Sequence, residues 1–253
     1  MALLKVNQIS KDFGGISALK KISLEIRKGE IRGLIGPNGA GKTTLFNIIS
    51  GIFCPTSGCV IFEEKEITGK KPYEVAKVGL SRTFQNIHLF QEMKVLQNIM
   101  VGQHCRSRAE LAGAIFKGPR VQAEENAIYE KSIQILKFIG LLDKKDDLAK
   151  NLAYGQQRLL EIGRALATEP KMLLLDEPAA GMNPEETSSL MGLIRILCDQ
   201  GYTILLIEHD MRMVMNISDR ITVLNFGEKI AEGEPSEVQR DQRVIEAYLG
   251  KEW

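Results

Sequence analysis

The sequence of 253 residues has no apolar run long enough to cross a membrane. Its longest apolar runs, such as residues 204–207, fall far short of the roughly 18 residues that a spanning helix needs. We therefore expect any membrane role of this chain to depend on a partner protein.

An excess of charge of one sign is also missing. Lysine and arginine number 33, and aspartate and glutamate number 32, so the formal net charge is +1. This balance gives no excess of positive charge that would attract nucleic acid, so we do not expect nucleic acid as a partner. The four cysteines have no zinc-like spacing, and no signal peptide precedes the first predicted strand. The simplest interpretation is a chain that works in a reducing cytoplasm.

A phosphate-binding loop is the strongest feature that the sequence does contain. Residues 36–44 fit the pattern G-x-x-x-x-G-K-[ST] in full, between an apolar strand at residues 30–35 and apolar residues at helical spacing. Glycine lets backbone N–H groups curl toward anionic oxygens, and the helix that follows adds its positive dipole end. We expect the whole loop to surround a triphosphate: Gly36, Pro37, Asn38, Gly39, Ala40, Gly41, Lys42, Thr43 and Thr44. Lys42 is expected to reach the β- and γ-phosphates, and the Thr43 hydroxyl to bind Mg²⁺.

Two adjacent acids end a second apolar strand. Asp176 and Glu177 follow residues 171–175, and such a pair can also belong to a solvated loop or a helix cap. A chain with a complete phosphate loop needs a second Mg²⁺ anchor at a strand end, which Asp176 can supply. Glu177 is then available to orient or deprotonate a water that attacks the γ-phosphate. His209 ends the strand at residues 203–207 and is expected at the same edge of the sheet.

The remaining segments predict antiparallel strands and helices. Alternating apolar residues predict antiparallel strands over residues 3–26 and a terminal hairpin over residues 221–231. Between about residues 98 and 150, apolar residues recur at helical spacing. Residues 152–157 open a further helix. Phe13 could stack on a nucleobase or could be a half-buried aromatic at a strand end.

In this order, the motifs resemble the ATP-binding subunit of ATP-binding cassette (ABC) transporters over essentially the whole chain. The resemblance implies an α/β fold, with a P-loop NTPase core built on a parallel sheet, an antiparallel β subdomain and a helical subdomain. It implies one ABC ATPase domain over residues 1–253. The RecA-like core and the antiparallel β subdomain would occupy residues 1–85 and 151–253, and the helical subdomain residues 86–150, continuing into the signature helix.

The same resemblance implies roles for individual residues. It makes residues 36–44 the Walker A loop and residues 152–156 the signature. The implied catalytic residues are Glu177, His209 and Lys42, with His209 as the switch histidine. The implied Mg²⁺ ligands are Thr43, the Q-loop glutamine Gln85 and the Walker B acid Asp176. The implied nucleotide contacts beyond the Walker A loop are Phe13, Gln85, Tyr154, Gly155 and Gln156.

The family's mechanism implies partners. Each ATP lies between the Walker A loop of one chain and the signature of another, so ATP closes a dimer of cassettes and hydrolysis reopens it. A chain with one copy of each motif must pair with a second copy or with a homologous subunit. Two transmembrane permease subunits would complete the transporter. Residues 86–95 and the helices after them would form a groove that receives helices from a membrane subunit, although apolar residues there could simply be core.

Two positions depart from the family's pattern. The common signature has a serine followed by two glycines, and Ala153 and Tyr154 replace the serine and the first glycine. Because Ala153 has no hydroxyl for the γ-phosphate, the N–H groups near Gly155 must carry more of that contact. The family's usual acid after Walker B is Asn183 here, which before Pro184 is typical of a helix N-cap.

Three strings narrow the resemblance to the larger ATP-binding subunit of branched-chain amino-acid importers. They are Asn-Leu-Ala-Tyr-Gly-Gln-Gln-Arg at 151–158, Glu-Pro-Ala-Ala-Gly-Met-Asn-Pro at 177–184 and Ala-Tyr-Leu-Gly at 247–250. This subgroup implies a second ATP-binding subunit, two membrane proteins and an extracytoplasmic amino-acid-binding protein. The implied location is the cytoplasmic face of the membrane, reached through the permease subunits.

Two other functions stay open at this point. One is a soluble ABC-type ATPase that is not coupled to transport, although such proteins usually carry two cassettes or a long coiled coil. The other is a regulatory cassette with little hydrolysis, which the alanine at position 153 favours.

Overall fold

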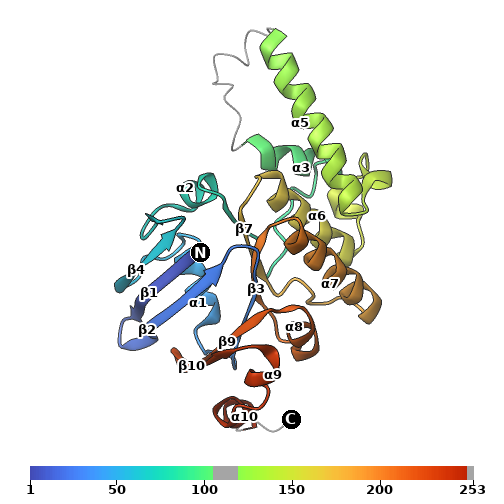
Figure 1. The fold of residues 1–253 in the computed structure, drawn as a ribbon. Helices are drawn as coiled ribbons and strands as arrows, with labels where there is room; N and C mark the ends of the chain where they lie inside the picture. Colours follow the sequence, from blue (N-terminus) through green and yellow to red (C-terminus); the bar gives the residue numbers. More distant parts are fainter. Residues whose placement is uncertain (105–118, 250–253) are drawn as a thin grey trace.

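A six-stranded sheet lies at the centre of the molecule (Figure 1). The computed structural model describes residues 1–104 and 119–249. The strand order is β10-β9-β3-β8-β7-β6, and every neighbouring pair is parallel except β9 and β10. The bounds are β3 (Ile31–Ile35), β6 (Leu80–Arg82), β7 (Met172–Asp176), β8 (Thr203–Ile207), β9 (Arg220–Asn225) and β10 (Glu228–Gly233). The predicted terminal hairpin is thus the antiparallel edge of this sheet.

The three central strands are buried along their whole length. Every residue of β3, β7 and β8 is buried, as the apolar runs in these strands predict for a parallel sheet covered on both faces. Since β3, β8, β7 and β6 are parallel neighbours, their carboxyl ends lie side by side at one edge. The segments that leave these four strands are therefore brought together.

A four-stranded antiparallel sheet packs beside the central one (Figure 1). Its order is β2-β1-β4-β5, with β1 (Ala2–Phe13), β2 (Ile16–Arg27), β4 (Ser57–Phe62) and β5 (Lys65–Glu66). Inward residues of both sheets and of α1 (Lys42–Ile49) share one apolar cluster, in which Leu4, Ile26, Leu34 and Phe46 are buried. The helix that follows the phosphate loop is thus fixed between the two sheets.

Helices cover the other face of the central sheet. The cluster on this face joins β7 and β8 to α3 (Val95–His104), α5 (Pro119–Phe138), α6 (Tyr154–Ala167) and α7 (Pro184–Asp199). Figure 1 shows α3 and α5 beyond the central sheet on the side opposite α10. A third cluster holds α8 (Met211–Ile217), α9 (Pro235–Val238) and α10 (Gln242–Leu249) against β9 and β10. The short α2 (Pro72–Lys77) precedes β6.

Helix α7 begins at the cap that the sequence predicts. The Asn183 side chain accepts the N–H groups of Glu185 and Glu186 at 3.0 and 2.9 Å, and the Glu186 carboxylate accepts the Asn183 N–H at 2.9 Å. This reciprocal arrangement satisfies donors that an open helix end would leave unpaired. None of the helices in the described ranges has the length and apolar character needed to cross a membrane.

A buried arginine joins both sheets. The Arg32 side chain on β3 is 2% exposed and donates to Glu30 at 2.6 Å, to Thr222 at 3.0 Å and to the Glu25 carbonyl at 2.9 Å. It also pairs with Glu232 on β10. One guanidinium therefore connects β2, β3, β9 and β10.

Replacing this arginine should destabilise the fold strongly. Arg32→Met removes the cation of the buried Glu30 and leaves Glu232 with Lys229 alone. Losing one partner of a buried ion pair costs about 3–5 kcal/mol. Urea unfolding should show this loss. In the matched control Lys5→Met, which removes a half-exposed pair with Glu25, the loss should stay below about 1 kcal/mol. Equal losses for the two variants would contradict the role given to Arg32.

Candidate functional site

Two glycines that have no room for a side chain shape the phosphate loop. A Cβ on Gly36 would lie 2.1 Å from the Leu224 carbonyl oxygen, and a Cβ on Gly41 would lie 2.8 Å from the Ala18 carbonyl oxygen. Their φ values of +152° and +102° are also ones that L side chains rarely adopt. Both positions therefore require glycine, and the loop follows the curled path that its sequence predicts.

Lys42 lies within this loop and is only 6% exposed. Its Nζ donates to the Gly36 carbonyl at 2.6 Å and to the Pro37 carbonyl at 3.1 Å. The positive charge is thus desolvated at the first residue of α1, where the helix dipole also favours an anion. The next residue, Thr43, is exposed, so its hydroxyl is accessible to a metal ion or a phosphate.

Side chains from three strand ends meet at Glu177. His209 Nε2 lies 2.8 Å from Glu177 Oε1, and the Gln85 amide nitrogen donates to Glu177 Oε2 at 3.1 Å. Glu177 has a φ of +47°, a left-handed conformation that costs a non-glycine residue roughly 1–2 kcal/mol. Its N–H donates to the Ile207 carbonyl at 2.9 Å, which holds this sharp turn in place. The carboxylate, which follows β7, is therefore positioned by contacts from the ends of β6 and β8.

Asp176 ends β7 in a buried ion pair. Its Oδ2 accepts Arg82 Nη2 at 2.7 Å, and the two side chains are 2% and 7% exposed. Arg82 also donates to Asn47 Oδ1 at 2.6 Å and to Ser50 Oγ at 3.0 Å, both at the end of α1. Burial raises the pKa of the Asp176 carboxyl, and the hydrogen bond and charge of Arg82 oppose that rise. The carboxylate is thus fixed in orientation relative to α1.

The donor set at this edge suits Mg²⁺. Thr43, Gln85 and Asp176 offer a hydroxyl, an amide oxygen and a carboxylate, which are the hard oxygen ligands that this ion prefers. The Gln85 nitrogen is used by Glu177, so the amide oxygen is the atom left to face a cation. The described residues contain no group of three or more His, Cys, Asp or Glu side chains that could hold a metal. A metal here would therefore have few protein ligands, and phosphate oxygens would supply others.

The signature residues pack against the segments that follow β7. A Cβ on Gly181 would lie 2.9 Å from the Tyr154 ring, and a Cβ on Gly155 would lie 2.7 Å from the Glu186 carboxylate. Tyr154 is 46% exposed, and its hydroxyl accepts Arg158 Nη2 at 3.1 Å. The Gln156 side chain accepts the Ala153 N–H at its amide oxygen Oε1, at 3.2 Å. None of these partners belongs to the phosphate loop.

Phe13 lies at the end of β1 and is 43% exposed. Its ring contacts the Phe53 ring edge-on at 5.4 Å, and Lys11 Nζ lies 4.9 Å from its centre. The ring is therefore exposed and offers surface on which a base could stack.

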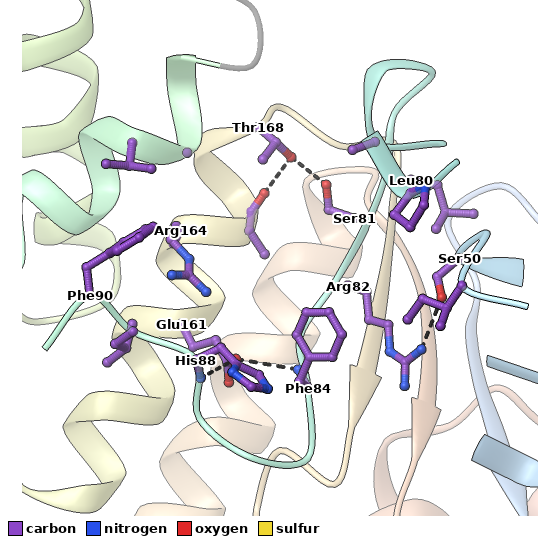
Figure 2. A pocket seen from close by; sticks show the side chains of 17 residues that line it. Ser50, Leu80, Ser81, Arg82, Phe84, His88, Phe90, Glu161, Arg164 and Thr168 are labelled. Atoms are coloured by element: carbon purple, nitrogen blue, oxygen red, sulfur yellow. Dashed lines mark hydrogen bonds between the residues drawn. The ribbon is translucent and has the colours of Figure 1, made fainter. Parts of the chain in front are cut away.

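A groove of about 690 Å³ opens between β6, α2, α3 and α6. Figure 2 shows its side chains, with Arg82 beside Ser50 on one side and Arg164 beside Phe90 on the other. The segment after β6 contributes Phe84, His88, Leu89 and Phe90 to its lining. Phe90 is 48% exposed, and Leu89 is partly buried against the helices. Part of this segment is thus core, and part faces the open groove.

Comparison with known families identifies the chain. Residues 19–180 match the family described as ABC transporter. The chain belongs to this family. Residues 228–253 of the cassette also match the family described as branched-chain amino acid ATP-binding cassette transporter. The resemblance noted in the sequence is confirmed at both levels.

Individual relatives agree with this assignment. The cassette is 46% identical to the high-affinity branched-chain amino acid transport ATP-binding protein LivG of Salmonella typhimurium, over 98% of each chain. It is similar to the ADP conformation of MJ1267, an ATP-binding cassette of an ABC transporter, with a TM-score of 0.87 and 39% identity. That match covers 99% of this chain and all of the other. The predicted ABC ATPase fold is therefore confirmed.

The cassette also contains functional neighbours that sequence reasoning missed. Arg82 beside Asp176, and Arg158 with Glu161 on α6, are buried charges to which the sequence-based predictions gave no role. The available signal was a charge at a core-facing position, such as Glu161 next to Leu160 and Ile162 in α6.

Gly36→Ala should damage the Walker A loop directly. The added methyl group would collide with the Leu224 carbonyl, so the loop must shift away from the Lys42 ammonium, and affinity for a fluorescent ATP analogue should fall at least about tenfold. Gly15→Ala is the control, because its Cβ would meet nothing within 4 Å. Equal affinities for the two variants would show that the close approach at Gly36 does not matter.

Proposed function

We propose that this cassette is the ATP-binding and ATP-hydrolysing motor subunit of an importer for branched-chain amino acids. The observation that carries the proposal is the Glu177 carboxylate, placed between His209 and Gln85 at the sheet edge from which the Walker A loop also leaves. Support for the substrate class comes from the match of residues 228–253 and from the printed names of the LivG relatives.

ATP would bind along the Walker A loop. The Lys42 ammonium, already desolvated, exchanges its contacts with two loop carbonyls for phosphate oxygens, and Phe13 stacks on the base. Thr43, Gln85 and Asp176 would hold Mg²⁺, which supplies charge neutralisation at the phosphates when bound. MJ1267 in its ADP conformation shows that a cassette of this fold binds a nucleotide.

Glu177 would act as the general base. A carboxylate at this position accepts a proton from the attacking water, and the contacts from His209 and Gln85 keep it oriented. His209 bonds the same carboxylate through Nε2, so its position responds to any movement of Glu177. The energetic cost of the left-handed Glu177 backbone is consistent with a site where geometry outweighs local stability.

A second cassette would complete each site. The signature residues Tyr154, Gly155 and Gln156 contact partners outside the Walker A loop of their own chain, and Tyr154 remains exposed. In the proposed dimer they face the nucleotide of the partner chain. A dimeric structure is known for the MJ0796 cassette, which is 26% identical with a TM-score of 0.78. Because Ala153 has no hydroxyl, the N–H groups at the start of α6 would meet the γ-phosphate.

The groove would receive a helix of one permease subunit, and with the permeases the cassette would lie at the cytoplasmic face of the membrane. Its floor combines apolar surface with Arg82, Glu161 and Arg164, which suits an amphipathic helix from a membrane protein. Residues 86–150 would form the helical subdomain beside it, and residues 1–85 and 151–253 the core. An extracytoplasmic amino-acid-binding protein would deliver the substrate to the permeases.

Glu177→Gln should stop turnover and trap an ATP-bound dimer. The amide keeps the shape of the side chain but cannot accept the water proton, so the ATPase rate should fall about 10²- to 10⁴-fold. Phosphate release and light scattering with ATP measure the two effects. Glu66→Gln, on the exposed edge strand β5, is the control and should hydrolyse normally. Normal ATP turnover in Glu177→Gln would contradict the assignment of Glu177 as the general base.

Ile52→Glu should release the membrane partners. Ile52 lines the groove and is 40% exposed, so a charge there removes apolar docking surface without burial in the core. Tagged cassette captured from gently solubilised membranes should carry two multi-spanning proteins and a second cassette, and Ile52→Glu should lose most of the spanning proteins. The control is Ile196→Glu, because Ile196 lies on α7 and is 49% exposed, and this variant should retain them. Capture of no membrane protein by the wild type would instead favour an ATPase that is not coupled to transport.

A further inference from the structure

A buried arginine and glutamate on α6 hold the segment that follows β6. Arg158 and Glu161 lie one helical turn apart, and each side chain is 2% exposed. Their own ion pair is long, with 3.4 Å between Arg158 Nη1 and Glu161 Oε2. Two buried charges need close and well-aligned partners to offset their desolvation, so the contacts that explain this pair must lie elsewhere.

Arg158 binds the backbone of two consecutive residues. Its Nη1 donates to the Phe84 carbonyl at 2.8 Å, and its Nη2 donates to the Gln85 carbonyl. The same Nη2 donates to the Tyr154 hydroxyl at 3.1 Å. A planar guanidinium presents its donors in a fixed fork, so these acceptors are held in one mutual geometry.

Glu161 binds backbone N–H groups of the same segment, whereas Arg158 binds its carbonyl groups. Its Oε1 accepts the N–H groups of Phe84 at 3.5 Å and of His88 at 3.3 Å, drawn as dashed lines in Figure 2. Residues 83–94 lie between β6 and α3 and belong to no helix or strand, so their polar backbone groups depend on such partners. The segment is therefore fastened to α6 through both donors and acceptors.

The fastened segment connects three features of the proposed motor. Gln85 donates to the Glu177 carboxylate at 3.1 Å. Phe84 and His88 line the groove, where their rings meet edge-on at 5.1 Å. Tyr154 opens the signature helix with nearly half of its surface exposed. One guanidinium thus touches the groove lining, the Q loop and the signature.

We propose that Arg158 and Glu161 are positioning residues that make residues 84–88 and the start of α6 move as one body. The inference rests on the proposed function, which gives the groove, Gln85 and Tyr154 their roles. A membrane protein seated against Phe84 would then shift Gln85 and Tyr154 together. Opening of the groove would change the hydrolytic site of this chain and the nucleotide contact offered to its partner in the same movement.

Hydrogen exchange tests the attachment without any nucleotide. Arg158→Lys keeps a positive charge beside Glu161 but replaces the fork with one ammonium, which cannot hold all three acceptors. In the full chain, exchange at the amides of residues 84–88 should become about tenfold faster, the size expected for losing a charged hydrogen bond. The control is Arg195→Lys, because Arg195 on α7 forms a half-exposed pair with Asp219. Exchange at residues 84–88 in this variant should stay within about twofold of wild type. Unchanged exchange in Arg158→Lys would overturn the proposal.

A double-mutant cycle tests the coupling to the signature. Tyr154→Phe removes only the hydroxyl that Arg158 binds, and dimerisation with ATP is measured in a Glu177→Gln background. We expect Tyr154→Phe to weaken the dimer several-fold (roughly 1 kcal/mol) when Arg158 is present. In the Arg158→Lys chain the same change should cost less than about twofold, because the contact is already lost. Additive effects would show that the residues act independently.

Failure of this inference is distinguishable from failure of the proposed function. If Glu177→Gln does not dimerise with ATP, the proposed function fails. Hydrogen exchange still tests whether residues 84–88 are attached to α6. If Arg158→Lys does not fold, Glu161→Gln replaces it, because the amide keeps an acceptor for Phe84 and His88 but has no charge. Faster exchange at residues 84–88 then supports the proposal, and exchange at the wild-type rate overturns it.

Discussion

The parallel pairing of β3, β8, β7 and β6 is the constraint on which the rest of the structure depends. Parallel neighbours end at the same edge, so residues that are far apart in the chain are delivered to one place. The Walker A loop, His209, the acids at 176 and 177, and Gln85 all leave from these ends. The two outer layers, the antiparallel sheet and the helices, bury the faces of this sheet and keep its strands in register.

Much of the site could be predicted from the sequence because its signals are local. The Walker A glycines, the acids after an apolar strand and the cap at Asn183 each lie within a few residues of what makes them recognisable, and the structure places them as elements of the kind expected. The antiparallel strands and the terminal hairpin were equally accessible from alternation and turns.

The buried charges could not be predicted in the same way. An arginine in a strand or a glutamate in a helix is most often solvated. Such a side chain is buried only where the fold supplies a partner for its charge. Glu161 meets the Phe84 N–H across 77 positions of sequence, and Arg82 meets Asp176 across 94. Without the fold, nothing near these residues distinguishes them from surface charges such as Lys5 and Glu25.

The close approach of Gly36 to the Leu224 carbonyl also affects the order in which parts of the chain can fold during synthesis. The Gly227 N–H donates to the Ala40 carbonyl. Some of the contacts that shape the Walker A loop therefore come from the hairpin of β9 and β10, late in the sequence. A ribosome makes the loop long before it makes that hairpin. During synthesis, the nucleotide pocket therefore stays unfinished until nearly the whole cassette has emerged. A nucleotide bound by this loop would therefore stabilise only chains in which that hairpin has already folded.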